Sequence, residues 1–294
     1  MEYRRCGRTD MVVSAVALGG HWKRVVKLIG GDESPGWMTM NIDLPEFQQN
    51  RHEVVSRCIE RGFNYVDASC GEEIMAYSRA LKGRRDRMYF GFSWHVRESR
   101  FEEWRSAARL REGLDAGLKE AGLEYVDLWR ISLLTDSHMH TPGEIEAVIE
   151  ALDWAKKTGR ARCIGVSSHD RPHLKELIET YPEQIEVILT PYTAKTKVVE
   201  DETGLWATIK KHNVGWFGIK PFASNSVFKG DSSPDSPYRE EDNRIARLAL
   251  RYILCNSSIT APIPGLISPQ QVDNVALAVM ERRELDLEEK AELE

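Results

Sequence analysis

A closed barrel of eight parallel strands, each followed by a helix, is the fold that three features of the sequence predict. The 294 residues show no linker and no shift in composition, so residues 1–294 are interpreted as one large domain. Short apolar runs that end in small polar residues alternate with charged amphipathic segments. This unit recurs about every 30 to 40 residues, the size of a strand with its crossover helix. A doubly wound open sheet is the alternative.

The individual elements follow from local patterns. The first strand is expected at 11–18, an apolar run that Gly19 stops. The clearest helix is expected at 102–121, where strong helix formers precede a glycine, and a second at 143–158 after a Thr-Pro pair. The eight strands are expected at 11–18, 63–67, 87–93, 125–131, 162–167, 184–190, 214–220 and 258–264.

The composition excludes several classes of protein. Forty basic and 46 acidic residues are interspersed and leave a net charge of −6, so nucleic acid is not an expected partner. No segment approaches the roughly 18 to 20 apolar residues of a membrane span, and no signal peptide is recognisable. Five scattered cysteines indicate neither a disulfide framework nor a structural zinc site. We expect a cytoplasmic protein without a membrane partner.

Two segments are long for the loops of such a barrel. They are 22–46, after the first strand, and 222–242, after the seventh. Both are expected at the carboxyl ends of the strands, where barrel enzymes have their active sites. Long loops at this position act as lids or ligand clamps, or they are simple surface insertions.

Six motifs in barrel order resemble those of the aldo-keto reductase family, and the similarity covers nearly the whole chain. The resemblance implies a barrel that is preceded by a short β-hairpin. It also implies hydride transfer between NADP or NAD and a small carbonyl compound, polyol or sugar. The motifs are residues 3–5 with 7–9, 13–14 with 18–20, 62–67, 125–128, 159–167, and 263–265 with Ser268, Gln271 and Asn274.

The family's catalytic tetrad has an aspartate, a tyrosine, a lysine and a histidine, and this chain matches only the aspartate, at Asp67. By the resemblance, Cys70 stands in place of the tyrosine in a shortened segment. Ser93 ends the third strand in place of the lysine, and Ser132 ends the fourth in place of the histidine. Loss of a proton donor costs about 10² to 10⁴ in rate, so an atypical active site is expected.

Without the lysine, a buried Asp67 needs a new partner. Arg130 precedes Ser132 by two residues on the same strand and therefore faces the same way. We hypothesise that Arg130 enters the barrel and pairs with Asp67, in volume released at Gly91 and Ser93. The alternative is that Arg130 faces the helices. His95 is the best substitute acid or base, because histidine titrates near neutral pH. The candidate catalytic residues are Asp67, Cys70, Ser93, His95, Arg130 and Ser132.

The resemblance also implies where a dinucleotide would bind. Ser167 and His169 match the nicotinamide position, the segment after the seventh strand covers the pyrophosphate, and the start of the last helix holds the adenosine phosphate. Lys220 is alternatively a catalytic cation. The resemblance implies NADP, but no lysine or arginine lies between Gly265 and Arg282, so NAD stays open. The candidate cofactor residues are Ser167, His169, Lys220, Pro221, Ala223, Asn225, Gly265, Ser268, Gln271 and Asn274.

Several histidines lie beside the expected strand ends. They are compatible with a different class of function, a metal-dependent enzyme. His138 and His140, with His169 and Asp136, could bind a divalent metal ion in an isomerase, epimerase or hydrolase. A third alternative is a catalytically silent protein that binds a nucleotide or another small molecule. The sequence does not predict the oligomeric state. The histidines beside strand ends are His21, His95, His138, His140, His169 and His173.

Overall fold

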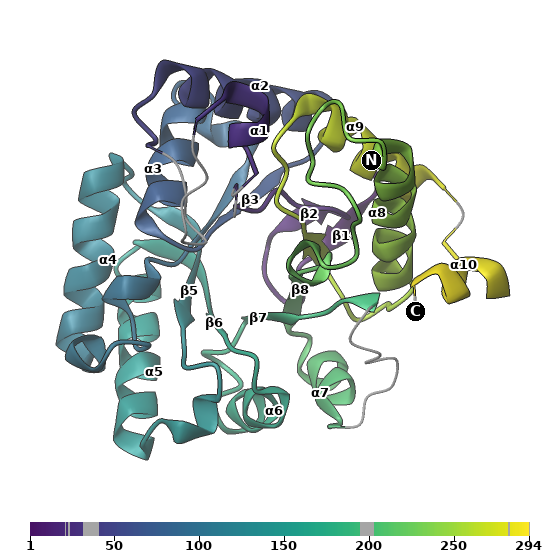
Figure 1. Cartoon of the computed structure of the whole chain (residues 1–294). Coiled ribbons are helices and arrows are strands. Elements are labelled where there is room, and N and C mark those ends of the chain that lie inside the picture. The colour runs from purple at the N-terminus through teal and green to yellow at the C-terminus, as the bar shows by residue number, and fades with distance from the viewer. Residues whose placement is uncertain (21, 23, 32–40, 195–202, 282, 294) are drawn as a thin grey trace.

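A computed structural model describes residues 1–20, 22, 24–31, 41–194, 203–281 and 283–293. Seven parallel strands, hydrogen-bonded in chain order, curve into a nearly closed barrel with helices on its outer face (Figure 1). Their bounds agree with seven of the expected strands to within three residues. The strands are β3 Tyr65–Ala68, β4 Tyr89–Phe92, β5 Val126–Ser132, β6 Ala161–Ser167, β7 Val187–Pro191, β8 Gly215–Ile219 and β9 Ala261–Ile263.

The barrel is closed by residues 17–19, between β3 and β9, without a regular strand. The Leu18 N–H donates to the Tyr65 carbonyl at 3.0 Å, and the Gly19 N–H donates to the Pro264 carbonyl at 2.8 Å. Isolated bridges join Leu18 to β3 and Gly19 to Gly265. The eighth position of the barrel is therefore filled by a segment of only a few residues.

The expected strand 11–18 is wrong as a single element. Its first part is β2 (Val12–Ser14), which pairs antiparallel with β1 (Tyr3–Arg5), so the hairpin implied by the resemblance is confirmed. The chain then bends at Ser14, whose hydroxyl donates to the Val16 carbonyl at 2.7 Å, and its remainder closes the barrel. The apolar run continues through this bend, so hydrophobic periodicity cannot reveal it.

Helices follow the strands and cover the barrel. The expected helix 102–121 begins later, because residues 102–104 form a 3-10 turn and the Ser106 hydroxyl caps α4 by accepting from the Arg109 N–H. None of the described helices is long and apolar enough to cross a membrane. The helices are α1 Val26–Ile29, α2 Pro45–Glu60, α3 Gly71–Ala80, α4 Ala107–Ala121, α5 Pro142–Lys157, α6 Arg171–Thr180, α7 Leu205–His212, α8 Arg239–Leu254, α9 Pro269–Met280 and α10 Leu287–Leu293.

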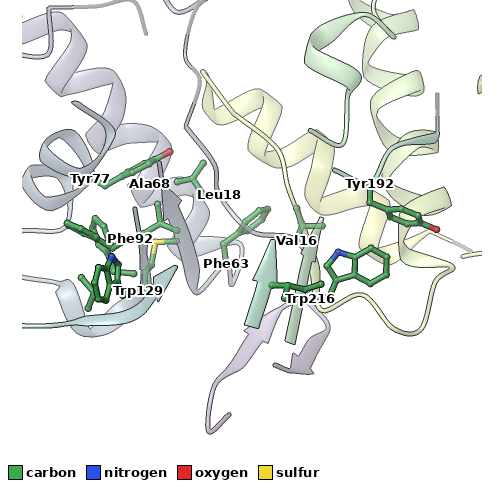
Figure 2. Packing of buried hydrophobic residues seen from close by; sticks show 14 of the residues in the cluster. Val16, Leu18, Phe63, Ala68, Tyr77, Phe92, Trp129, Tyr192 and Trp216 are labelled. Atoms are coloured by element: carbon green, nitrogen blue, oxygen red, sulfur yellow. The ribbon is translucent and has the colours of Figure 1, made fainter. Parts of the chain in front are cut away.

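The apolar core has two parts. A large layer lies between the barrel and the helices, where the rings of Tyr192 and Trp216 pack with centroids 5.1 Å apart (Figure 2). A smaller cluster fills the barrel, where Tyr65 stacks on Phe217 at 4.3 Å. Met11, near the hairpin, belongs to this inner cluster. The hairpin side of the barrel is thus packed with apolar side chains, and the carboxyl ends of the strands are left for a site.

Candidate active site

A cavity of about 710 Å³ opens at the carboxyl ends of the barrel strands. Asp67, Arg130 and Ser132, at the ends of β3 and β5, line it. Both long loops contribute to its wall, the first through Arg24 and Leu28 and the second through several residues between 222 and 242. The expected location of these loops is confirmed, although residues 32–40 of the first lie outside the described part of the chain.

The cavity contains a buried ion pair. Arg130 Nη2 lies 2.5 Å from Asp67 Oδ2, and Arg130 Nε donates to Asp67 Oδ1 at 3.2 Å. The hypothesis that these two residues pair inside the barrel is confirmed. The Tyr65 hydroxyl also donates to Asp67, at 3.2 Å. Gly91 leaves the necessary room, because a Cβ there would lie 2.1 Å from the Tyr65 hydroxyl and 2.6 Å from Asp67 Oδ1.

Arg130 is charged in this setting. Burial lowers the pKa of Arg130, but the charge of Asp67 and its hydrogen bonds outweigh burial, so the pKa is raised overall. A guanidinium that is fixed by its carboxylate and lines the cavity is a preorganised donor toward a developing oxyanion.

A second buried carboxylate, Glu98, organises the floor beneath the cavity. It accepts hydrogen bonds from the Ser93 hydroxyl at 2.5 Å, the Ser132 N–H at 2.7 Å and the Trp129 indole N–H at 3.2 Å. Burial raises the pKa of Glu98. Ser93 is fully buried and does not line the cavity, whereas Ser132 does. Sequence reasoning missed Glu98, since nothing local distinguishes it from exposed glutamates nearby.

His95 lines the cavity in the short turn that follows β4. Its Nδ1 contacts the Ser69 carbonyl oxygen at 2.9 Å, and because that oxygen can only accept, Nδ1 carries the proton. In the neutral ring the lone pair is then on Nε2. Burial lowers the pKa of His95 below its ordinary value of 6.5, and the charge of Arg100 adds to this effect. The geometry suits a general acid or base.

The structure does not bring Cys70 together with these residues. Cys70 is buried at the position that precedes α3, and it does not line the cavity. Burial raises the pKa of its thiol far above the ordinary value. The thiol is therefore a poor proton donor or nucleophile at neutral pH.

The expected cofactor residues line the same cavity, with the exception of Ala223. The side chains at the start of α9 are engaged within the protein. Ser268 caps the helix by accepting from the Gln271 N–H, and Asn274 contacts Arg247 at 2.5 Å. A ligand at this helix start would meet backbone N–H groups more readily than these side chains.

The segment between 220 and 232 adopts an uncommon backbone. Outside it, Asn213 is the remaining non-glycine residue with positive φ in the described chain. Such conformations cost about 1–3 kcal/mol each and cluster at ligand-binding sites. Asp242 holds the segment by accepting from the N–H groups of Lys229 and Gly230, each at 2.9 Å. The residues with positive φ are Lys220, Ala223, Ser224, Asn225 and Ser232.

Three arginines in the cavity wall were missed by sequence reasoning. Arg24 donates to the Gly230 carbonyl at 2.8 Å and so joins the two long loops. Arg100 follows the turn that contains His95, and Arg239 begins α8. Arg239 reaches this wall from α8, so the residues 265–282 give no sign of it. With the many hydroxyls of this wall, these cations form a donor set for anionic ligands, among them the phosphates of a dinucleotide.

The geometry does not gather the histidines into a metal site. His138 Nδ1 lies 2.6 Å from Asp170, and His140 contacts Glu144 at 3.2 Å. In the described residues, no three His, Cys, Asp or Glu side chains are close enough to share an ion. The proposed ligands His138, His140, His169 and Asp136 therefore do not form a cluster, and His21 lies outside the described residues.

Comparisons with known proteins show which proteins this chain is similar to. Residues 36–294 match the model of the Aldo/keto reductase family. L-galactose dehydrogenase of Arabidopsis thaliana is 24% identical over 63% of this chain and 62% of its own length. L-glyceraldehyde 3-phosphate reductase of Escherichia coli K12 is 28% identical over 47% of this chain and 40% of its own.

These matches span roughly half the length of the curated relatives, between 40% and 62% for the two named. A solved aldo-keto reductase from Bacillus halodurans, in its holo form, superposes with a TM-score of 0.69. The superposition covers 100% of this chain and 95% of that one at 21% identity, and it supports the fold.

Proposed function

The chain belongs to the aldo/keto reductase family, and from this premise we propose that it is an NAD(P)-dependent oxidoreductase with an atypical active site. Its substrate is a small carbonyl compound, or the corresponding polyol or sugar. The observation that carries the proposal is that one cavity connects all of these groups. It joins the buried Asp67–Arg130 pair and His95 to the strained segment 220–232 and to the start of α9.

The residues of this chain would hold the dinucleotide along the cavity wall. Ser167 would contact the nicotinamide, and residues 221–232 of the strained segment would contact the pyrophosphate. The start of α9 takes the adenosine end, where the guanidinium of Arg239 favours the additional phosphate of NADP. When bound, the nicotinamide supplies or accepts a hydride.

The protein's own groups complete the reaction at the carbonyl. Arg130, fixed by Asp67, donates to the carbonyl oxygen and stabilises the negative charge that develops there as the carbon receives the hydride. His95 gives its proton to that oxygen, so that an alcohol forms and a neutral imidazole remains. In the oxidative direction His95 takes the hydroxyl proton. His95 thus replaces the tyrosine that the family uses.

The names of the relatives supply a set of substrates to try. They include L-galactose dehydrogenase, L-glyceraldehyde 3-phosphate reductase and NADH-specific methylglyoxal reductase. Small aldehydes, ketoaldehydes and sugars are therefore the first compounds to offer this chain.

Turnover of such a panel with NADPH and NADH tests the proposal. We expect cofactor oxidation with at least one compound, and His95→Asn should abolish most of it. His52→Asn is the matched control, because His52 is exposed on α2 and does not line the cavity. Cofactor binding without turnover of any compound would indicate a silent nucleotide-binding protein and would contradict the oxidoreductase assignment.

A further inference from the structure

Three basic side chains line the same cavity as Arg130. Arg100 comes from the loop after β4, His169 from the loop after β6 and Lys220 from the end of β8. Arg100 donates to the Thr135 hydroxyl at 3.0 Å, beside the end of β5. In the described part of the chain, neither Arg100 nor Lys220 forms an ion pair with a carboxylate. We call Arg100, His169 and Lys220 the basic cluster.

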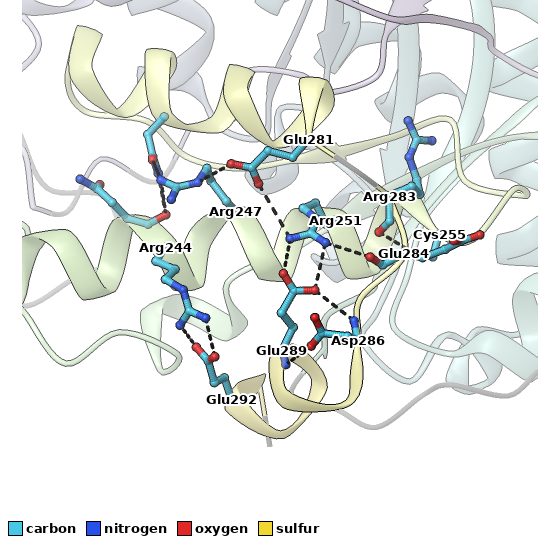
Figure 3. A network of polar contacts seen from close by, with 12 residues as sticks. Arg244, Arg247, Arg251, Cys255, Glu281, Arg283, Glu284, Asp286, Glu289 and Glu292 are labelled. Carbon is cyan, nitrogen blue, oxygen red and sulfur yellow. Dashed lines mark hydrogen bonds and ion pairs between the residues drawn. The ribbon is translucent and has the colours of Figure 1, made fainter.

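Many other cations of this protein pair with carboxylates. On the outer face of α8, Arg247 pairs with Glu281 at 2.9 Å and Arg251 pairs with Glu289 at 2.8 Å (Figure 3). Arg130, which lines the cavity, also forms an ion pair with a carboxylate, that of Asp67. The basic cluster differs from these pairs, because Arg100 contacts the Thr135 hydroxyl and no carboxylate in the described part of the chain.

Charges within the basic cluster lower the pKa values of His169 and Lys220. Burial and the charges of Lys220 and Arg100 lower the pKa of His169 to about 4. Burial and Arg100 also lower the pKa of Lys220. The charge of Asp67 is taken up by Arg130, and Asp136 is the carboxylate that acts on His169. His169 is therefore uncharged at neutral pH, and the positive charge is that of Arg100 and Lys220. Grouping these two cations in a partly desolvated cleft is unfavourable until an anion enters, and it attracts anions to the cleft.

We propose that the basic cluster binds an anionic group of the substrate, a phosphate or a carboxylate. The enzyme then acts on carbonyl compounds that carry this anion a few bonds from the reacting carbon. The inference rests on the proposed function and names the substrate class for it. Arg100 is its main determinant, because its bond to Thr135 keeps it next to β5, where Arg130 lies. Residues 221–232 and the start of α9, which suit the dinucleotide, follow β8 and β9 instead.

Matched pairs of substrates test the substrate class. Glyceraldehyde 3-phosphate is compared with glyceraldehyde, and succinic semialdehyde with butanal, by kcat/KM. At least one anionic compound should exceed its neutral partner about tenfold or more. Arg100→Ala should lower kcat/KM for the anionic compound by about ten- to a hundredfold, the range for one charge-assisted hydrogen bond. Arg100→Lys should restore part of the preference.

Arg109→Ala is the matched control, since Arg109 lies on α4 and pairs with Glu112. This variant should keep the full preference for the anionic substrate. Equal kcat/KM for the charged and neutral members of both pairs, in a protein that does turn over, would overturn the inference while the oxidoreductase function stands.

Calorimetry with inorganic phosphate separates the inference from the proposed function. Phosphate should bind to the wild type, with or without saturating NADP, and more weakly to Arg100→Ala. If phosphate binds in this way but no carbonyl compound is reduced, the basic cluster is an anion site and the proposed function fails. Displacement of phosphate by NADP would assign the cations to the cofactor and overturn the inference, as would the absence of any phosphate binding.

Discussion

Two groups of arginines in this molecule are arranged in opposite ways. On the outer face of α8, Arg244, Arg247 and Arg251 each contact a glutamate from α9, α10 or the adjoining chain (Figure 3). In the cavity wall, Arg24 and Arg100 contact backbone carbonyls or hydroxyls. Arg239 and Lys220 likewise have no carboxylate partner among the described residues.

The difference indicates what each group does. The three arginines of α8 pair with glutamates of the same chain and join α8 to the carboxyl-terminal elements. Their charges therefore contribute to the stability of the fold. The cavity cations retain their charge for a ligand. Arg130 combines the two arrangements, because it lines the cavity and is compensated by Asp67. These assignments predict different effects when each arginine is removed.

The largest effect on folding is expected at the compensated cavity arginine. Arg130→Met leaves Asp67 as a buried charge without its partner, which costs about 3–5 kcal/mol of unfolding free energy. Urea denaturation measures the loss. The double variant Arg130→Met/Asp67→Leu should recover most of it, since apolar replacements of a buried pair are often neutral. A single variant with a loss below about 1 kcal/mol, typical of exposed pairs, would contradict the buried pair.

The next effect is on catalysis. His95→Asn should lower kcat by about 10² to 10⁴ with little change in cofactor binding. Reduction needs the protonated imidazole, so its rate should be highest below the lowered pKa of His95 and fall as pH rises through a midpoint under 6.5. Oxidation should show the reverse dependence.

The pH profile of the variant checks this assignment. The remaining activity of His95→Asn should lose that midpoint, because no other group is proposed to exchange the proton. An unchanged midpoint in the variant would assign the titration to a different residue.

A smaller effect separates two arginines of one helix. Arg239→Ala, in the cavity, should weaken NADPH binding about ten- to a hundredfold and leave NADH binding unchanged, because one charge-assisted contact to the additional phosphate is lost. Fluorescence titration measures both dissociation constants. Arg244→Ala, five residues further along α8, should leave both values as they are. Equal weakening of NADPH and NADH binding would refute the role given to Arg239.

The smallest effect is expected on the outer face. Arg244→Ala removes an exposed pair with Glu292 and should cost about 0.2–1 kcal/mol of unfolding free energy. The cost should shrink further in high salt, which screens exposed charges. Urea denaturation at low and high salt provides the measurement, and a cost that does not depend on salt would argue against a surface ion pair.

The sequence predicted the parts of the molecule that repeat or alternate. Strand–helix units at regular spacing predicted the barrel, and the two-residue period of a strand predicted that Arg130 would meet Asp67. The expected strand 11–18 failed because a bend at Ser14 leaves the hydrophobic pattern unchanged.

Loop residues were harder to predict for a physical reason. Glu98, Arg100 and Arg239 reach the site through the path of the chain between elements, which no local period encodes. Cys70 is the opposite case, a residue that was predicted in the site and does not line the cavity. Its place in the sequence matches the catalytic tyrosine, but the start of α3 fixes its side chain in the core.

The most direct test of the central claim is a titration of the wild-type protein with NADPH and NADH, followed by tryptophan fluorescence and calorimetry. If the cavity cations are held for a dinucleotide and an anionic substrate, at least one cofactor should bind with a micromolar dissociation constant. Inorganic phosphate should still bind in its presence. No binding of either cofactor up to millimolar concentration would contradict the account.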